Sequence, residues 1–199
     1  MRFLTTLLMI IFSLMASAQE QKSEETTSTS ILDLDESWGK EIFLFPIPFA
    51  PSINYTGIAE VRFPPSGWRI PEHPFFWSYT YVWSVDSEAE ITTSRIEQDL
   101  ENYFDGLNDV RENHNLDRKA ESTLVHSKRD TNEVFLSGTV STYDRFATNA
   151  LIILNVKVKI HSCDKRKGKT ILFTFSPQDF ESEIWETLDD IKFLESYCN

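Results

Sequence analysis

Two cysteines, Cys163 and Cys198, have the most readily predicted chemistry in this chain. In an oxidising compartment such a pair forms a disulfide. The bond would close a loop of about 36 residues and stabilise the fold by roughly 3–4 kcal/mol in the chain-entropy description. The alternative is two free thiols, one of them buried. Neither a CxxC motif nor a cluster of cysteine and histidine along the sequence indicates a redox or zinc site, so we expect no metal.

Acid–base and nucleophilic catalysis has little support in the sequence. Glycine-rich phosphate loops, the GxSxG elbow and the HExxH motif are all absent. The histidines lie far apart in sequence, and adjacent carboxylates on a helix point away from each other. We therefore expect no catalytic residue and no cofactor. The alternative is a cleft hydrolase in which loops bring His73 and His114 to acidic residues.

An aromatic and proline-rich segment contains the clearest candidate for binding. Residues 63–83 read FPPSGWRIPEHPFFWSYTYVW. The odd positions from 75 to 85 alternate with small polar residues and predict a core face, because exposing so many large rings to water would be costly. Aromatic side chains outside that face can hold apolar ligands or anchor a protein partner. The candidate binding residues are Trp68, His73, Phe75 and Phe76, where the loop meets the strand.

A basic cluster in the last third of the chain is a second candidate. It comprises Lys157, Lys159, Lys165, Arg166, Lys167 and Lys169. Such a cluster can attract an anionic partner. The interpretation that we favour is a hairpin whose charges protect an edge strand from aggregation.

The periodicity of the apolar residues predicts the elements that position these candidates. Alternation with a period of two predicts strands over residues 53–63, 75–86, 121–127, 132–143, 149–162 and 170–176. Helical spacing predicts a helix that begins with a capping box at Ser94 and Glu97 and stops at Asp105-Gly106. It also predicts a second helix from Pro177 to Leu194. The fold class is therefore α+β: an antiparallel β-sheet of about six or seven strands with two amphipathic helices packed on it, in the order β-β-α-β-β-β-β-α.

The N-terminus predicts export. Arg2 precedes an apolar run of about 13 residues, short of the roughly 20 that cross a bilayer, and the run ends at Ala16-Ser17-Ala18. We expect residues 1–18 to be a cleaved secretory signal peptide, without a lipoprotein anchor because no cysteine follows. Residues 19–36 are expected to be a flexible polar leader. Residues 37–199 then form a single α+β domain.

The charge of the chain limits its partners. It carries 19 basic against 31 acidic residues, a net charge of −12, which disfavours nucleic acid and anionic lipid. After signal cleavage we expect no membrane-spanning segment. The expected protein is secreted or periplasmic and is a non-catalytic module that binds an unknown protein or small-molecule ligand. A further alternative is a structural subunit of an envelope complex that uses the apolar segment 46–51.

Mass spectrometry of the exported protein checks the signal peptide. We expect a chain that starts at Gln19, because signal peptidase cleaves after a small-x-small pattern. An exported chain that retains residues 1–18 would contradict this prediction.

Overall fold

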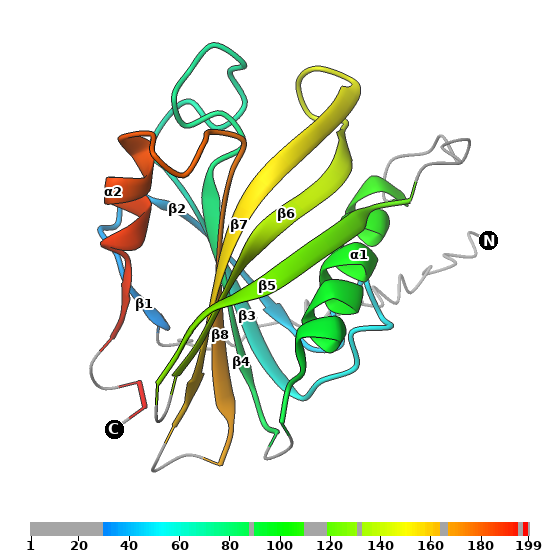
Figure 1. Ribbon diagram of the computed structural model, residues 1–199, viewed down its shortest axis with the longest axis vertical. Coiled ribbons are helices and arrows are strands. Elements are labelled where there is room, and N and C mark those ends of the chain that lie inside the picture. The colour runs from blue at the N-terminus through cyan, green and yellow to red at the C-terminus, as the bar shows by residue number, and fades with distance from the viewer. Residues whose placement is uncertain are drawn as a thin grey trace, which may run out of the picture.

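The computed structural model describes residues 30–87, 90–109, 119–130, 133–163, 167–194 and 197–198. Its body is a seven-stranded antiparallel sheet with the strand order β2-β3-β4-β8-β7-β6-β5 (Figure 1). The strands are β2 (Gly39–Leu44), β3 (Gly57–Phe63), β4 (Tyr79–Val85), β5 (Glu121–Arg129), β6 (Glu133–Asp144), β7 (Ala150–Ser162) and β8 (Lys169–Ser176). Helices α1 (Thr93–Asp109) and α2 (Ile184–Asp189) and a small sheet of β1 (Leu32–Asp33) and β9 (Lys192–Phe193) complete the fold. The predicted antiparallel α+β class is confirmed.

The element order differs from the predicted one at both ends. Four strands precede α1 rather than two, and β9 follows α2. The additional strands are short or lie at an edge: β2 is the edge strand of the main sheet, and β1 pairs with β9 over two residues each. Such strands show no extended alternation of apolar and polar residues, so periodicity alone does not detect them.

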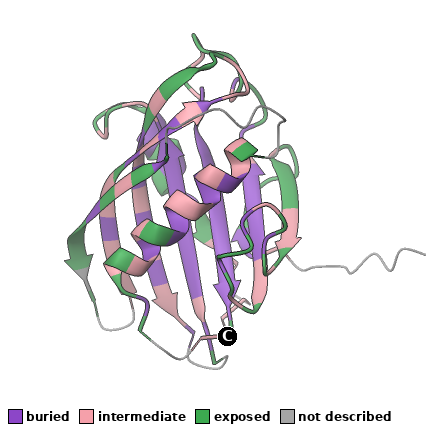
Figure 2. Ribbon diagram, turned by 90° about the vertical axis from the view of Figure 1, so that its right-hand side faces the viewer, coloured by how far each residue is buried: buried purple, intermediate pink, exposed green. Residues whose placement is uncertain are grey.

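Strand β4 is an interior strand of the sheet and is buried on both faces. All of its residues from Tyr79 to Val85 are buried, and β3 and β8 pair with it on either side. Its odd-numbered residues pack under α1, and we call this face of the sheet the inner face. Figure 2 shows α1 crossing the buried part of the sheet. Val82 packs on the opposite, outer face with α2, β1 and β9. The small even residues, such as Thr80 and Ser84, therefore form a second packed layer.

Helix α1 begins and ends at different residues from those predicted. Thr92 caps it by accepting the Arg95 backbone N–H at 3.2 Å, and Ser94 lies inside the helix, so the predicted capping box is wrong. The helix also continues through Gly106, the predicted stop. A Cβ at Gly106 would lie 1.9 Å from the carbonyl oxygen of Phe49, so glycine here permits close packing rather than termination.

Three acidic residues on one side of α1 bind the free edge of β5. Glu97 accepts the Leu124 N–H at 2.7 Å, Glu101 accepts the Ser122 N–H at 3.0 Å, and Asp105 accepts the Ala120 N–H at 2.8 Å. The acidic residues are four positions apart on the helix, a rise of about 6 Å, and the N–H groups are two positions apart along the strand, about 6.6 Å. The spacing of the acceptors therefore matches that of the donors. These carboxylates satisfy the donors of an edge strand that would otherwise be free to pair with another chain.

A buried carboxylate holds residues 30–35 across the outer face of β3. Glu60 accepts the Ile31 N–H at 2.6 Å and the Ser30 hydroxyl at 2.7 Å. Its neighbour Arg62 donates to the Leu34 carbonyl at 3.1 Å and lies 3.5 Å from Glu60. The sequence places Glu60 and Arg62 on a polar strand face, yet both are buried. The packed part of the chain thus starts before residue 37, the expected domain boundary, and residues 1–29 lie outside the described residues.

The second helix is much shorter than predicted. Helix α2 covers Ile184–Asp189 only, and the residues before it are held to β7 instead. The carbonyl of Gln178 accepts both the Asn155 side-chain amide at 2.9 Å and the Trp185 indole N–H at 3.0 Å. After α2 the chain becomes extended at β9. Across the described residues, no helix combines the length and apolar character needed to cross a membrane.

The turn between β6 and β7 is organised by one buried carboxylate. Asp144 accepts the backbone N–H groups of Phe146, Ala147 and Thr148 at 2.8, 3.1 and 2.8 Å, and the Thr148 hydroxyl at 2.7 Å. Burial alone would raise the pKa of Asp144, but the hydrogen bonds outweigh it and lower this pKa below its ordinary value.

Removing one carboxylate from the β5 edge tests its energetic role. Glu97→Ala leaves the Leu124 N–H without its acceptor, so we expect the free energy of unfolding to fall by about 1–3 kcal/mol in urea denaturation. Gln98→Ala, an exposed position on the same helix, should change it by less than about 0.5 kcal/mol. Equal losses in the two variants would contradict the role of the carboxylate.

The pH dependence of stability tests the Asp144 turn. Its folded pKa is lowered, so its contribution is complete above the unfolded pKa of about 3.9 and is lost as the pH falls through the folded pKa. We expect Asp144→Asn to lower the free energy of unfolding by about 1–3 kcal/mol at neutral pH. The difference from wild type should shrink below about pH 3.9. The exposed Asp179→Asn is the control; a pH-independent deficit in Asp144→Asn would refute the assignment.

Candidate functional site: a groove on the outer face

A groove of about 430 Å³ lies on the outer face, between the strands β6 to β8 and the α2–β9 segment. Its apolar walls come from both sides and comprise Phe135, Leu172, Phe180, Leu188, Ile191 and Phe193. The same sheet face continues beyond the groove with Val125, Leu151 and Ile153, which are 60%, 52% and 61% exposed. Size and lining are those of a small-molecule site: a concave, mostly apolar surface with a few polar groups.

Lys157 joins the floor of the groove to its α2 wall. Its ammonium lies 2.6 Å from an Asp189 carboxylate oxygen and 4.7 Å from the centre of the Trp185 ring. The ring of Phe180 is 5.5 Å away. An aromatic face attracts a cation through its quadrupole, and a carboxylate supplies the opposite charge. These contacts fix the position of the ammonium group at the wall.

Lys159 occupies the equivalent position nearer the end of β7. Its ammonium lies 2.7 Å from Glu133 and about equally far from the rings of Phe135 and Phe193, at 5.6 and 5.5 Å. Glu133 also lies 3.3 Å from Nδ1 of His161, whose ring contacts Phe193. The β9 wall is therefore held by the same kind of aromatic and ionic contacts as the α2 wall.

The groove contains more cations than carboxylates, on an acidic protein. Three lysines line it, Lys157, Lys159 and Lys192; Asp189 pairs with the first and Glu133 with the second. Lys192 is exposed, and the described part of the chain shows no ion pair for it. The whole chain has a net charge of −12, so this local excess of cations stands apart from its surroundings. Two members of the sequence-predicted basic cluster, Lys157 and Lys159, thus lie in the groove rather than on a free edge.

The sequence-predicted Trp68 belongs to a different and smaller pocket, on the inner face. Its ring stacks on Phe63 at 4.6 Å and lies under the Arg69 guanidinium at 4.3 Å. Trp77 and Phe146 are among the residues that complete this aromatic pocket of about 130 Å³. That volume is below the usual range for small-molecule sites, so the pocket holds at most a very small group.

The other three sequence-predicted residues face different parts of the fold. Phe76 is buried in the inner core, and Phe75 packs against the outer cluster. The predicted alternation fails here because Trp77 has a positive φ of 50° and the strand starts only at Tyr79. Nδ1 of His73 accepts the Phe75 backbone N–H at 3.1 Å, which holds the loop. The structure therefore does not bring Trp68, His73, Phe75 and Phe76 together in one of the cavities that it describes.

A larger hollow of about 710 Å³ beside the start of α1 is polar. It is lined by both acidic and basic side chains, and His126 there lies 3.1 Å from the Thr93 hydroxyl. Because its lining is polar and carries charges of both signs, this hollow suits water better than an apolar ligand. His114, named in the hydrolase alternative, lies outside the described residues. In the segment proposed for an envelope partner, Ile47 is buried and Phe49 packs on the core.

The predicted disulfide between Cys163 and Cys198 is present. It ties the end of β7 to the segment that follows β9, and so closes the end of the groove wall formed by Phe193. Sequence reasoning placed neither His161 nor Glu133 near this bond. The signal available in the sequence was the position of His161 two residues before Cys163, which puts both side chains on one face of a strand.

Comparison of the chain with protein-family models, with curated proteins and with solved structures gives no match. The function must therefore be argued from the chemistry of the site.

Proposed function

We propose that the protein is an exported, non-catalytic binding module whose groove takes a small amphipathic ligand with an apolar body and an anionic group. The observation that carries this proposal is a groove of about 430 Å³ with apolar walls and three lysines, on a chain of net charge −12. Export is supported by the disulfide, because such bonds persist in oxidising compartments.

The apolar walls account for the ligand's body. Leu172, Leu188 and Ile191 in the walls are already buried. The partly exposed rings are Phe135 on the sheet side and Phe180 and Phe193 on the side of the α2–β9 segment. A ligand that covers these side chains removes apolar surface from water, worth roughly 25 cal/mol per Å² before the costs of association. The walls are also fixed in advance by the contacts of Lys157 and Lys159, so little ordering remains to be done on binding.

The lysines account for the anionic group. An ammonium has three N–H donors, and the Lys157 contact to Asp189 uses one of them. The remaining donors are held beside an apolar surface, where a charge-assisted hydrogen bond is stronger than in bulk water. Lys192 adds a cation at the rim. An anionic group therefore finds donors that are already positioned.

Fluorescence titration with anilinonaphthalene sulfonate, an amphipathic anion, tests the proposal. We expect saturable binding that weakens with added salt, and displacement by decanoate but much less by decanol. Lys192→Glu should weaken the affinity about tenfold, because it replaces an attraction by a repulsion at the rim. Near-UV circular dichroism confirms that each variant remains folded.

Lys40→Glu is the matched control. Lys40 is exposed on β2, at the other end of the sheet, and the same charge reversal there should leave the affinity within about twofold of wild type. Equal effects of the two reversals, or equal displacement by decanol and decanoate, would refute binding of an anion in the groove.

A further inference from the structure

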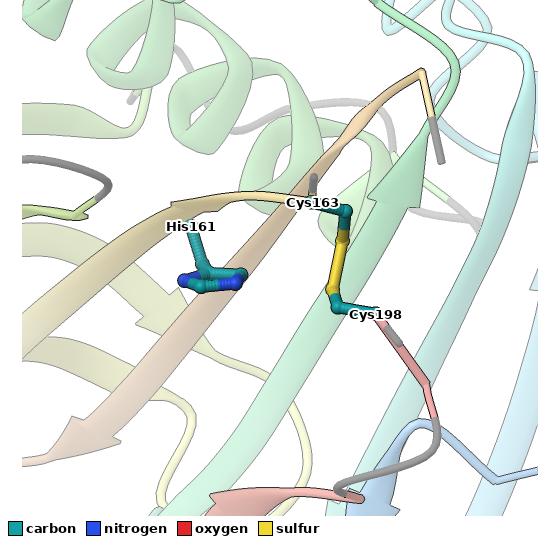
Figure 3. Close-up of side chains that lie close together, drawn as sticks. All are labelled: His161, Cys163 and Cys198. Atoms are coloured by element: carbon teal, nitrogen blue, oxygen red, sulfur yellow. A yellow bond between two sulfur atoms is a disulfide. The ribbon is translucent and has the colours of Figure 1, made fainter. Parts of the chain in front are cut away.

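A histidine and two cysteines meet at the end of the groove wall. His161 and Cys163 come from the end of β7, and Cys198 comes from the C-terminal segment; Figure 3 shows the imidazole beside the disulfide. One ligand atom from each residue lies within 4.8 Å of the others. Cys163 is buried, whereas His161 and Cys198 are partly exposed, so the cluster is accessible from solvent.

The groups around the cluster match those that surround a metal centre. The Thr170 hydroxyl lies 3.5 Å from the sulfur of Cys163 and 3.6 Å from that of Cys198, within reach of both. A Glu133 carboxylate oxygen lies 3.3 Å from Nδ1 of His161. A carboxylate in this position orients a ligating imidazole, and a hydroxyl can donate to a thiolate. Neither group is required by a disulfide.

We propose that the reduced protein binds one divalent zinc-class ion through His161, Cys163 and Cys198. A thiol reductant first converts the disulfide to two cysteine thiols and is itself oxidised to a disulfide. The metal ion then displaces the two thiol protons, and two thiolates balance its charge. Zinc–sulfur and zinc–nitrogen bonds of about 2.3 and 2.0 Å place neighbouring ligand atoms up to about 4 Å apart. The two sulfur atoms must therefore move apart once their bond is broken, whereas the imidazole already lies within 4.8 Å of both.

Oxidation and metal binding exclude each other, because both use the sulfur atoms of Cys163 and Cys198. Both also produce the same link, from the end of β7 to the segment after β9. The structure thus assigns this link to a disulfide under oxidising conditions and to a metal ion under reducing ones. The β9 wall of the groove remains attached in either state.

Cobalt(II) is the probe that tests the site, because its visible absorption reports tetrahedral thiolate ligation. The protein is reduced with a phosphine, desalted without oxygen and titrated. We expect one equivalent of cobalt to give intense tetrahedral bands with sulfur-to-metal charge transfer, and zinc to displace it. The disulfide-bonded protein should give no such bands.

His161→Ala removes one ligand and leaves both cysteines in place. We expect it to weaken cobalt binding at least about tenfold, while the exposed His126→Ala has no effect. Both variants form the disulfide when oxidised, so near-UV circular dichroism of the oxidised forms verifies their fold. If reduction itself loosens the protein, cobalt should restore the near-UV signal, because binding favours the folded state. Absent bands, equal affinities of the two variants, or binding by the oxidised protein would each overturn the proposal.

Discussion

Burial of β4 on both of its faces is the constraint that the rest of the structure satisfies. A strand whose residues are all buried needs a partner at each edge and a covering layer on each face. Strands β3 and β8 supply the edges, and α1 covers the aromatic face. The opposite face is covered by α2, β1 and β9, which pack around Val82. The groove exists because this outer layer covers only part of the sheet.

The sequence predicts those parts of the fold that are set by local periodicity. The strands β3 to β8 and the buried stripe of α1 follow from alternation and helical spacing. Interactions between distant residues set the parts that were missed. Glu60 and Arg62 have the pattern of an exposed strand face, and only the docking of residues 30–35 explains their burial. The sequence 177–194 has a helical apolar pattern, yet its contacts to β7 and β1 hold much of it in other conformations.

The candidate site was less predictable than the fold because its walls come from two separate parts of the chain. The disulfide was predictable from composition and the expected compartment. The groove was not predictable, because its lysines are positioned by residues far away in the sequence. Lys157 contacts Asp189 and Trp185, and Lys159 contacts Glu133. No rule of sequence spacing connects these residues. Most aromatic residues of the segment 63–83 pack in the core. In this chain, a segment rich in aromatic residues therefore identifies core residues more reliably than it identifies a binding site.

The pairing of β4 with β8 has a consequence for the order of folding. Tyr79 pairs with Phe175, so β4 receives its second neighbour only after β5, β6 and β7 have been synthesised. Until then, β4 presents an unpaired edge and the rings of Tyr79, Tyr81 and Trp83, and such a segment is prone to aggregation. Closing this long-range contact is a slow step compared with forming the hairpins. A chaperone that covers this segment during biosynthesis would therefore limit aggregation.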